Sequence, residues 1–135
     1  MNNLMSELHA WSELEPEYCS VTPNNVRVFV GNKYRYLRPR KLLSGLRYGV
    51  LFTAIEEAIH RRGWTWKMDV DETSFEYVSR AVISILTDKK KYAVTFMVYD
   101  YDRISVNAVE ELTVAALVAL VKCYLTALAN EKVDT

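Results

Sequence analysis

The feature that most constrains the fold is a pair of apolar, β-prone segments joined by a short polar turn. Residues 75–86 begin with alternating apolar positions and end as a nearly continuous apolar run, and residues 91–101 repeat this character after the polar turn at 87–90. β-Branched and aromatic side chains of this kind favour a pleated, half-buried surface. A hairpin of this length is not stable alone, so the rest of the chain must supply a covering layer.

Three other stretches show the apolar spacing of helices. Residues 46–62 place apolar side chains at i, i+3, i+4, i+7 and i+8, with Ser44 as the expected N-cap and Gly63 just past the end. Residues 107–130 are apolar nearly all round, which predicts burial on more than one side or an oligomer interface. Residues 2–14 form a shorter amphipathic pattern.

A second hairpin is predicted nearer the N-terminus, where residues 26–30 and 33–37 flank Gly31-Asn32. Glycine in the first turn position favours a type II′ turn, because that position needs a positive φ. Residues 64–72 are ambiguous and are expected to form a short strand followed by an acidic loop.

The order of these elements predicts an α+β fold: an antiparallel sheet built from two hairpins, sandwiched or covered by two or three helices. The 135 residues are expected to form a single domain, with an N-terminal helix and basic hairpin over 1–40 and a helix–hairpin–helix core over 44–130.

Composition supports an ordinary globular protein, because half of the residues are apolar and a quarter are charged. Cys19 and Cys123 are isolated, so no disulfide framework is expected, and Cys123 is expected to be buried because it lies within an apolar helical pattern. The N-terminus lacks a basic segment followed by an apolar one, and Lys122 interrupts the last apolar stretch. A cytoplasmic protein without a membrane-spanning segment is therefore predicted.

The formal net charge is zero, but the charges are unevenly distributed along the chain. Residues 26–67 hold ten basic side chains and only two acidic ones, whereas the segments on either side are acidic. Such asymmetry indicates either internal pairing, here with the acidic N-terminal helix, or a surface for an anionic partner.

The basic hairpin and the residues that follow it supply the candidate binding site. Its cations suit phosphates or an acidic protein surface, and its aromatic rings can stack on unpaired bases. Strand alternation places Lys33 and Arg35 on one face and Tyr34 and Tyr36 on the other, which weakens the stacking hypothesis. The candidate partner-binding or nucleic-acid-binding residues are Arg27, Lys33, Tyr34, Arg35, Tyr36, Arg38, Arg40, Lys41 and Arg47.

No catalytic motif is evident, and no cofactor is expected. Two carboxylate pairs, Asp69 with Asp71 and Asp100 with Asp102, each present oxygen ligands in one direction on an extended segment, as a Mg²⁺ or Ca²⁺ site requires. Neither pair matches a calcium-loop pattern, so no metal site is assigned. The two cysteines and two histidines are too scattered to indicate zinc.

Two tryptophans follow the 46–62 helix. Trp64 and Trp66 share one face if their segment is extended. One of them is expected to fill the core between helix and sheet, and the alternative is an exposed aromatic anchor for a partner.

From residue 46 to residue 130 the chain resembles the small phage-encoded ABA-sandwich domains. The resemblance rests on Arg62-Gly63-Trp64 after the first long helix, and on the Ala-rich stretch at 114–120 in the closing helix. It implies a bacteriophage or prophage source. The family has no established activity, so no functional residue is carried over.

Three functions are open at this point. The first is a non-catalytic interaction protein, such as a phage accessory factor that binds and modulates a host protein. The second is a nucleic-acid-binding module that uses the basic hairpin. The third is a divalent-metal-dependent enzyme built on the two carboxylate pairs. A homodimer through the closing helix is a further expectation.

Overall fold

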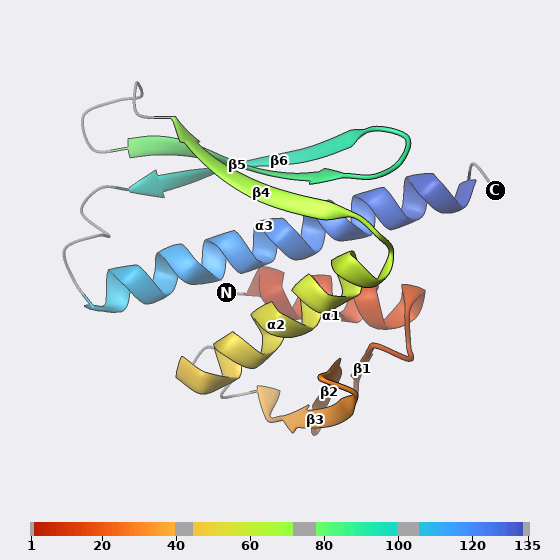
Figure 1. Cartoon of the computed structure of the whole chain (residues 1–135). Coiled ribbons are helices and arrows are strands. Elements are labelled where there is room, and N and C mark those ends of the chain that lie inside the picture. Colours follow the sequence, from red (N-terminus) through yellow and green to blue (C-terminus); the bar gives the residue numbers. More distant parts are fainter. Residues whose placement is uncertain (1, 40–44, 72–77, 100–105, 134–135) are drawn as a thin grey trace. The chain divides into compact units, whose positions relative to one another are not determined.

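A computed structural model describes residues 2–39, 45–71, 78–99 and 106–133, and the side chains of residues 4–39, 49–69, 80–97 and 114–131. The described chain contains three helices and two three-stranded antiparallel sheets, which confirms the predicted α+β class (Figure 1). It separates into two compact units, Met1–Gly63 and Trp64–Thr135. The two hairpins belong to different sheets, one in each unit, and the single domain stays a prediction.

The first unit contains two helices and the smaller sheet, whose strand order is β1-β2-β3 (Figure 1). Helix α1 packs against β1, and α2 packs against β2. The expected 2–14 and 46–62 helices are confirmed, the second to within one residue at each end. The elements are α1 (Asn2–Leu14), β1 (Cys19–Val21), β2 (Val26–Val30), β3 (Lys33–Leu37) and α2 (Gly45–Arg61).

One face of this sheet is buried. The register pairs Cys19 with Val28, so their side chains lie on the same face together with Val26, and all three are fully buried. The Cys19 thiol lies 3.7 Å from the Leu8 carbonyl oxygen of α1. Helix α1 therefore covers this face, and Leu8 on its apolar side is itself buried. Strand β1 was not expected from the sequence.

The turn between β2 and β3 differs from the prediction. Gly31 has φ 57° and Asn32 has φ 65°, so both central residues are left-handed, as in a type I′ turn. The predicted type II′ turn is wrong, because it needs a positive φ only at its first position. Asparagine tolerates this conformation better than most residues, which allows the turn whose twist matches the flanking strands.

A buried carboxylate joins the C-terminal ends of the two helices of the first unit. The indole Nε1 of Trp11 donates to Glu15 Oε1 at 3.0 Å, and the Arg62 guanidinium donates to Glu15 Oε2. Glu15 is only 1% exposed, so these partners compensate the cost of burying its charge. Gly63 follows α2 with φ 75°, which is the expected C-terminal glycine.

The second unit is a sheet of strand order β4-β5-β6 with one long helix packed against β5 and β6. Its elements are β4 (Thr65–Asp71), β5 (Val78–Leu86), β6 (Lys91–Tyr99) and α3 (Val106–Val133). Over the described residues the long hairpin and the closing helix are confirmed. The acidic loop expected after Trp66 is wrong, because β4 continues through Asp69 and Asp71, paired with β5 throughout.

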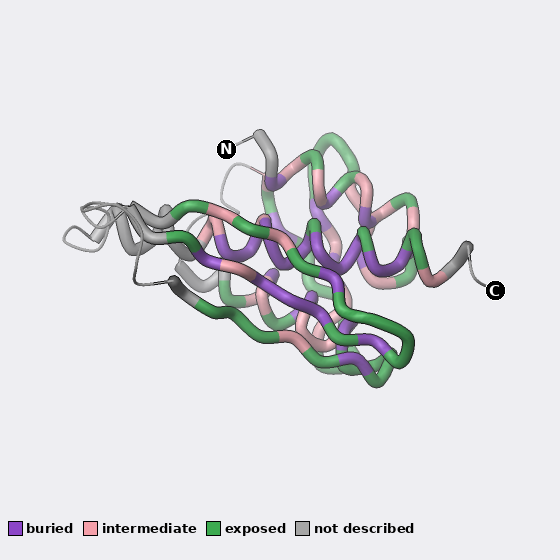
Figure 2. The backbone as a smooth tube through the Cα atoms, turned by 90° about the horizontal axis from the view of Figure 1, so that it is seen from above, coloured by how far each residue is buried: buried purple, intermediate pink, exposed green. Residues whose placement is uncertain are grey.

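The core of the second unit is formed by β5 and by α3, which packs against the sheet, and buried residues recur along both in Figure 2. Ala81, Ile83 and Ile85 alternate along β5 toward the helix and are fully buried. The Cys123 thiol of α3 lies 3.3 Å from the Tyr92 carbonyl oxygen. Trp64 is buried and packs edge-on against Tyr124 at 6.0 Å between ring centroids, so it fills the core as expected.

Helix α3 contains one stretch, Val114–Glu131, that is long and apolar enough to cross a membrane by length and composition alone. Half of this stretch is buried within the chain, and a core helix has the same composition. Its buried residues lie on several sides of the helix and are Ala116, Leu117, Ala119, Leu120, Val121, Cys123, Tyr124, Leu125, Ala127 and Leu128. The homodimer stays a prediction.

Candidate functional site: the basic hairpin

The candidate site lies on the β2–β3 hairpin of the first unit. Strand β3 is an edge of its sheet, and four consecutive residues of it, from Lys33 to Tyr36, are exposed. Tyr36 is 65% exposed and Tyr34 is 45% exposed, which is unusual for rings of this size. Arg38 follows the strand and is exposed as well. The site therefore presents charged and aromatic groups to solvent at once.

The strand register assigns these side chains to the two faces. Lys33 and Arg35 pair with Val30 and Val28, and therefore lie on the sheet face that α1 covers further along. Tyr34 and Tyr36 pair with Phe29 and Arg27 on the opposite face. The predicted separation of Lys33 and Arg35 from the tyrosines thus agrees with the register.

Arg27, however, shares the face of the tyrosines. Its guanidinium carbon lies 4.5 Å from the centre of the Tyr34 ring, a cation–π distance, and the Tyr34 ring lies 5.2 Å from that of Phe29. One charge therefore does share the face of the rings, which alternation within β3 alone could not show. A strand pattern shows which side chains alternate, but the residue opposite depends on the register.

Sequence reasoning missed two residues of α2 that contact the hairpin region. The Arg61 guanidinium, from the last turn of α2, lies 4.5 Å from the centre of the Tyr18 ring and 5.1 Å from that of Phe29. Glu57, one turn earlier, forms a salt bridge with Arg61 and accepts a hydrogen bond from the Gly31 amide at 2.9 Å. The spacing of Glu57 and Arg61 on one helix face was the only signal in the sequence.

The hairpin cations lack acidic partners among the described side chains. The salt bridges there are Arg61–Glu57, Arg62–Glu15 and Lys67–Asp69, and none involves Lys33, Arg35 or Arg38. Within the described part of the chain, the hydrogen bond that Arg27 donates goes to the backbone carbonyl of Pro16, at 3.3 Å. Pairing with the acidic N-terminal helix, one of the two alternatives, is not seen over these residues. Instead, Glu15 just after that helix pairs with Arg62.

The side chains of three candidate residues are not described by the structure. Arg40 and Lys41 lie outside the described residues. Arg47 lies in α2, but its side chain is outside the described part. The geometry of the site accordingly rests on the hairpin itself.

The carboxylates proposed for metal binding are only partly described. Asp69 is exposed and its Oδ2 lies 3.5 Å from the Lys67 ammonium nitrogen. Asp100, Asp102 and the side chain of Asp71 lie outside the described residues. Within the described residues, no group of three His, Cys, Asp or Glu side chains is arranged to hold a metal ion.

The two thiols are free and buried, and they are poor nucleophiles. Burial raises the pKa of Cys19 to about 12, although the nearby positive charge of Arg27 opposes the shift. Burial also raises the pKa of Cys123 to about 11, against a hydrogen bond at the Ile85 backbone. Because the thiolate is the reactive form, both sulfurs are largely inert near neutral pH.

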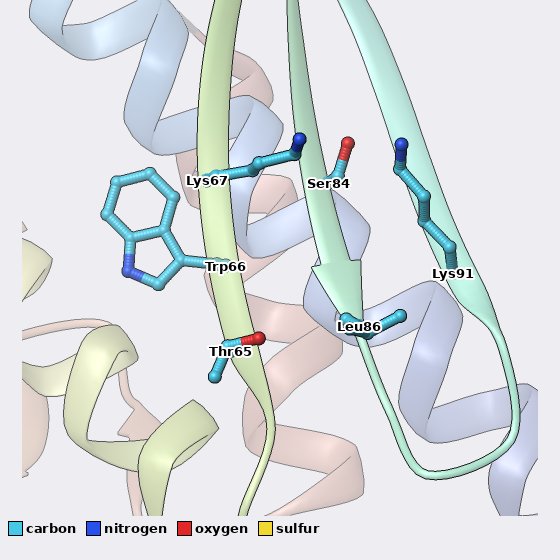
Figure 3. A pocket seen from close by; sticks show the side chains of 6 residues that line it. All are labelled: Thr65, Trp66, Lys67, Ser84, Leu86 and Lys91. Carbon is cyan, nitrogen blue, oxygen red and sulfur yellow. The ribbon is translucent and has the colours of Figure 1, made fainter.

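A shallow depression lies on the face of the second sheet opposite α3 (Figure 3). The ammonium groups of Lys67 and Lys91 flank the Ser84 hydroxyl, whereas the Trp66 ring points away from them. Ser84 is 3% exposed, and its Oγ has no hydrogen-bond partner among the described residues. The residues that line the depression include no carboxylate or imidazole to activate that hydroxyl, so they do not form a catalytic pair.

Comparisons of the chain with protein-family models, with curated proteins and with solved structures find no match. The function must therefore be argued from the geometry of the site.

Proposed function

We propose that this chain is a non-catalytic interaction protein that binds an acidic surface of another protein through its basic hairpin surface. We define this surface as Arg27, Lys33, Tyr34, Arg35, Tyr36 and Arg38. The observation that carries the proposal is the exposure of Lys33, Arg35 and Arg38 without a carboxylate partner among the described side chains, beside two exposed tyrosines.

Physical chemistry favours a binding role for such a surface. Clustered like charges repel one another in the free protein, and an acidic partner relieves that repulsion while steering the encounter. Arginine and tyrosine are also enriched among the residues that dominate binding energy at protein interfaces. Arg27 is already held against the Tyr34 ring, so it loses less conformational freedom when a partner binds.

The resemblance to phage ABA-sandwich domains supports a narrower form of the proposal. In that form, the chain is a phage or prophage accessory factor, and the acidic surface belongs to a host protein that it modulates.

Single-stranded nucleic acid is the second candidate ligand. It is favoured by the position of Arg27, Tyr34 and Tyr36 on one sheet face, where a ring can stack on a base while a cation meets a phosphate. Lys33 and Arg35 lie on the other face, so fewer cations can follow one strand of phosphates. This makes a protein partner the better-supported proposal.

Fluorescence anisotropy with two labelled probes tests the proposal and separates the candidates. The probes are a short poly-glutamate and a single-stranded oligothymidine, each measured at low and at physiological salt. Poly-glutamate is expected to bind at low salt and to weaken with added salt, as screened charges do. Tighter binding of oligothymidine would favour the second candidate, and no binding of either probe at low salt would overturn both.

Charge-reversal variants locate the binding site. Arg35→Glu/Arg38→Glu is expected to abolish the binding of poly-glutamate. Lys89→Glu/Lys122→Glu makes the same change in net charge at exposed positions of the second unit and is expected to preserve most of it. Equal losses in both variants would show that net charge, rather than the hairpin, controls binding.

A further inference from the structure

The outer edge of β3 is open among the described residues. Strand order places β3 at the end of its sheet, and both its faces are exposed from Lys33 to Tyr36. An edge strand presents unpaired backbone amides and carbonyls, and another chain can pair with them. This edge therefore offers backbone hydrogen bonds as well as side chains.

The two-residue turn determines which backbone groups point outward. In such a hairpin the residues next to the turn, Val30 and Lys33, form a hydrogen-bonded pair, and the pairs alternate from there. Arg35 is consequently bonded to Val28, whereas Tyr34 and Tyr36 lie at non-hydrogen-bonded pairs. The backbone N–H and C=O groups of Tyr34 and Tyr36 thus point away from β2.

The side chains along this edge alternate in chemistry. Lys33 and Arg35 lie on one face and carry positive charge, whereas Tyr34 and Tyr36 lie on the other and expose aromatic surface. A strand placed beside β3 would put its own alternate residues against these two sets. Acidic residues are complementary to the first set, and apolar residues are complementary to the second.

We propose that the partner contributes an extended segment that adds to β3 as a fourth strand, with acidic and apolar residues in alternation. This inference rests on the proposed function and specifies how the acidic partner is recognised. Backbone pairing supplies affinity, and the side chains on each face supply specificity. The acidic residues of the segment meet Lys33 and Arg35, and its apolar residues lie on Tyr34 and Tyr36.

The other described sheet edges are less suited to this ligand. Strand β1 has only three residues. Strand β4 carries both signs of charge at its edge, because Lys67 pairs with Asp69. Strand β6 begins with Lys91 but continues on the same face with the uncharged Ala93 and Thr95. Among these edges, β3 alone combines a row of cations with a row of exposed rings.

The first test compares two labelled peptides of identical composition. One alternates glutamate and valine, and the other has all its glutamates first and its valines after them. The alternating peptide is expected to bind about tenfold more tightly. Only its order places glutamates against the cations and valines against the rings while its backbone pairs with β3. Equal affinity would overturn strand addition and leave the proposed function intact, whereas no binding of either peptide would contradict the proposed function itself.

The second test removes backbone donors from the peptide. Methylating the amides of the glutamates, or those of the valines, blocks one edge of the peptide strand and leaves the other free. Only one edge of the peptide strand can face β3. One methylated peptide is therefore expected to lose binding and the other to keep it. If both methylated peptides bind as tightly as the parent peptide, backbone pairing is absent and the inference is wrong.

Amide hydrogen exchange gives a direct readout on the intact protein. Saturating alternating peptide is expected to slow exchange at Tyr34 and Tyr36, whose amides point outward, with less change at Arg35, which is already bonded to Val28. The variant Tyr36→Ala removes a ring but keeps the amide, so the protection at residue 36 should persist under saturating peptide. Slowing confined to α1 or to the second unit would contradict the proposed edge.

Discussion

Both hairpins of this chain pair two antiparallel strands, but the environments of their strands differ. In β5, the alternate residues Ala81, Ile83 and Ile85 are fully buried beneath α3. In β3, every residue from Lys33 to Tyr36 is exposed. The turns differ as well. The Thr87 hydroxyl accepts hydrogen bonds from the Lys89 and Lys90 amides of its own turn, whereas Gly31 and Asn32 adopt positive φ and the Gly31 amide donates to Glu57 of α2.

This difference separates stability from recognition. The β5–β6 hairpin is held by apolar burial, which is the main favourable term in folding. The outer strand of the β2–β3 hairpin contributes little buried surface beyond Leu37, and it carries cations that the described part of the chain does not neutralise. Side chains that contribute little to folding stability remain available to bind a partner.

The largest effect is expected in the β5 core. Ile83→Ala should lower the free energy of unfolding by about 2–5 kcal/mol, because it removes buried methyl groups and leaves a cavity under α3. Urea denaturation measures this change. Thr95→Ala, an exposed position on β6, is the control and should stay within about 0.5 kcal/mol of the parent. If Ile83→Ala lowers the free energy of unfolding by less than about 1 kcal/mol, roughly half of the smallest decrease expected, the assignment of Ile83 to the core is contradicted.

The next effect concerns the buried carboxylate. Glu15→Gln should lower the free energy of unfolding by about 1–3 kcal/mol, because Arg62 loses its charged partner while the Trp11 hydrogen bond can persist. The matched control, Glu13→Gln, changes an exposed residue of α1 and should have little effect. Equal unfolding curves for the two variants would show that Glu15 contributes no specific pairing.

A substitution in the β2–β3 turn is expected to have a smaller effect on the free energy of unfolding. A glycine in α2 supplies a control whose effect has the opposite sign. Gly31→Ala should cost about 1–2 kcal/mol, because an L side chain is strained at φ 57°. Gly49→Ala lies within α2 with open space around the added methyl group, and it should stabilise the protein by about 0.5–1 kcal/mol. Thermal or urea unfolding of both variants checks the pair, and a neutral Gly31→Ala would argue against the type I′ turn.

The two buried thiols are expected to change the stability of the protein only at alkaline pH. Burial raises their pKa values from 9.0 to about 12 for Cys19 and to about 11 for Cys123. Above pH 9.0 the unfolded chain therefore loses these two protons while the folded protein still keeps them. Their contribution to stability is full below pH 9.0 and is lost as the pH rises through these folded values. The unfolding free energy of the parent should therefore fall relative to Cys19→Ala/Cys123→Ala in that window, and parallel pH profiles would contradict it.

Periodicity predicted most of the elements because burial enforces it. The α2 helix and the β5–β6 hairpin lie where apolar spacing indicates them, and Gly63 ends α2 with the expected positive φ. The type of the Gly31-Asn32 turn was predicted wrongly, because glycine suits either turn and Asn32 decides between them. Strand β1 has only three residues, too few for alternation to show.

The candidate site was predicted only in part, because its geometry depends on contacts between distant residues. Local alternation correctly separated Lys33 from Tyr34, but the position of Arg27 over that ring depends on the register. Arg61 reaches the Phe29 ring from another element, and no spacing in the sequence joins those two residues. The same holds for the pair of Glu15 and Arg62, which are far apart in the sequence.

The central claim is that the cations of the basic hairpin surface serve binding rather than folding, and one variant tests it most directly. For Arg35→Glu/Arg38→Glu, the unfolding free energy and the affinity for poly-glutamate are measured on the same preparation. We expect stability within about 0.5 kcal/mol of the parent and complete loss of binding at low salt. A loss of stability above about 1 kcal/mol, or binding equal to that of the parent, would contradict the claim.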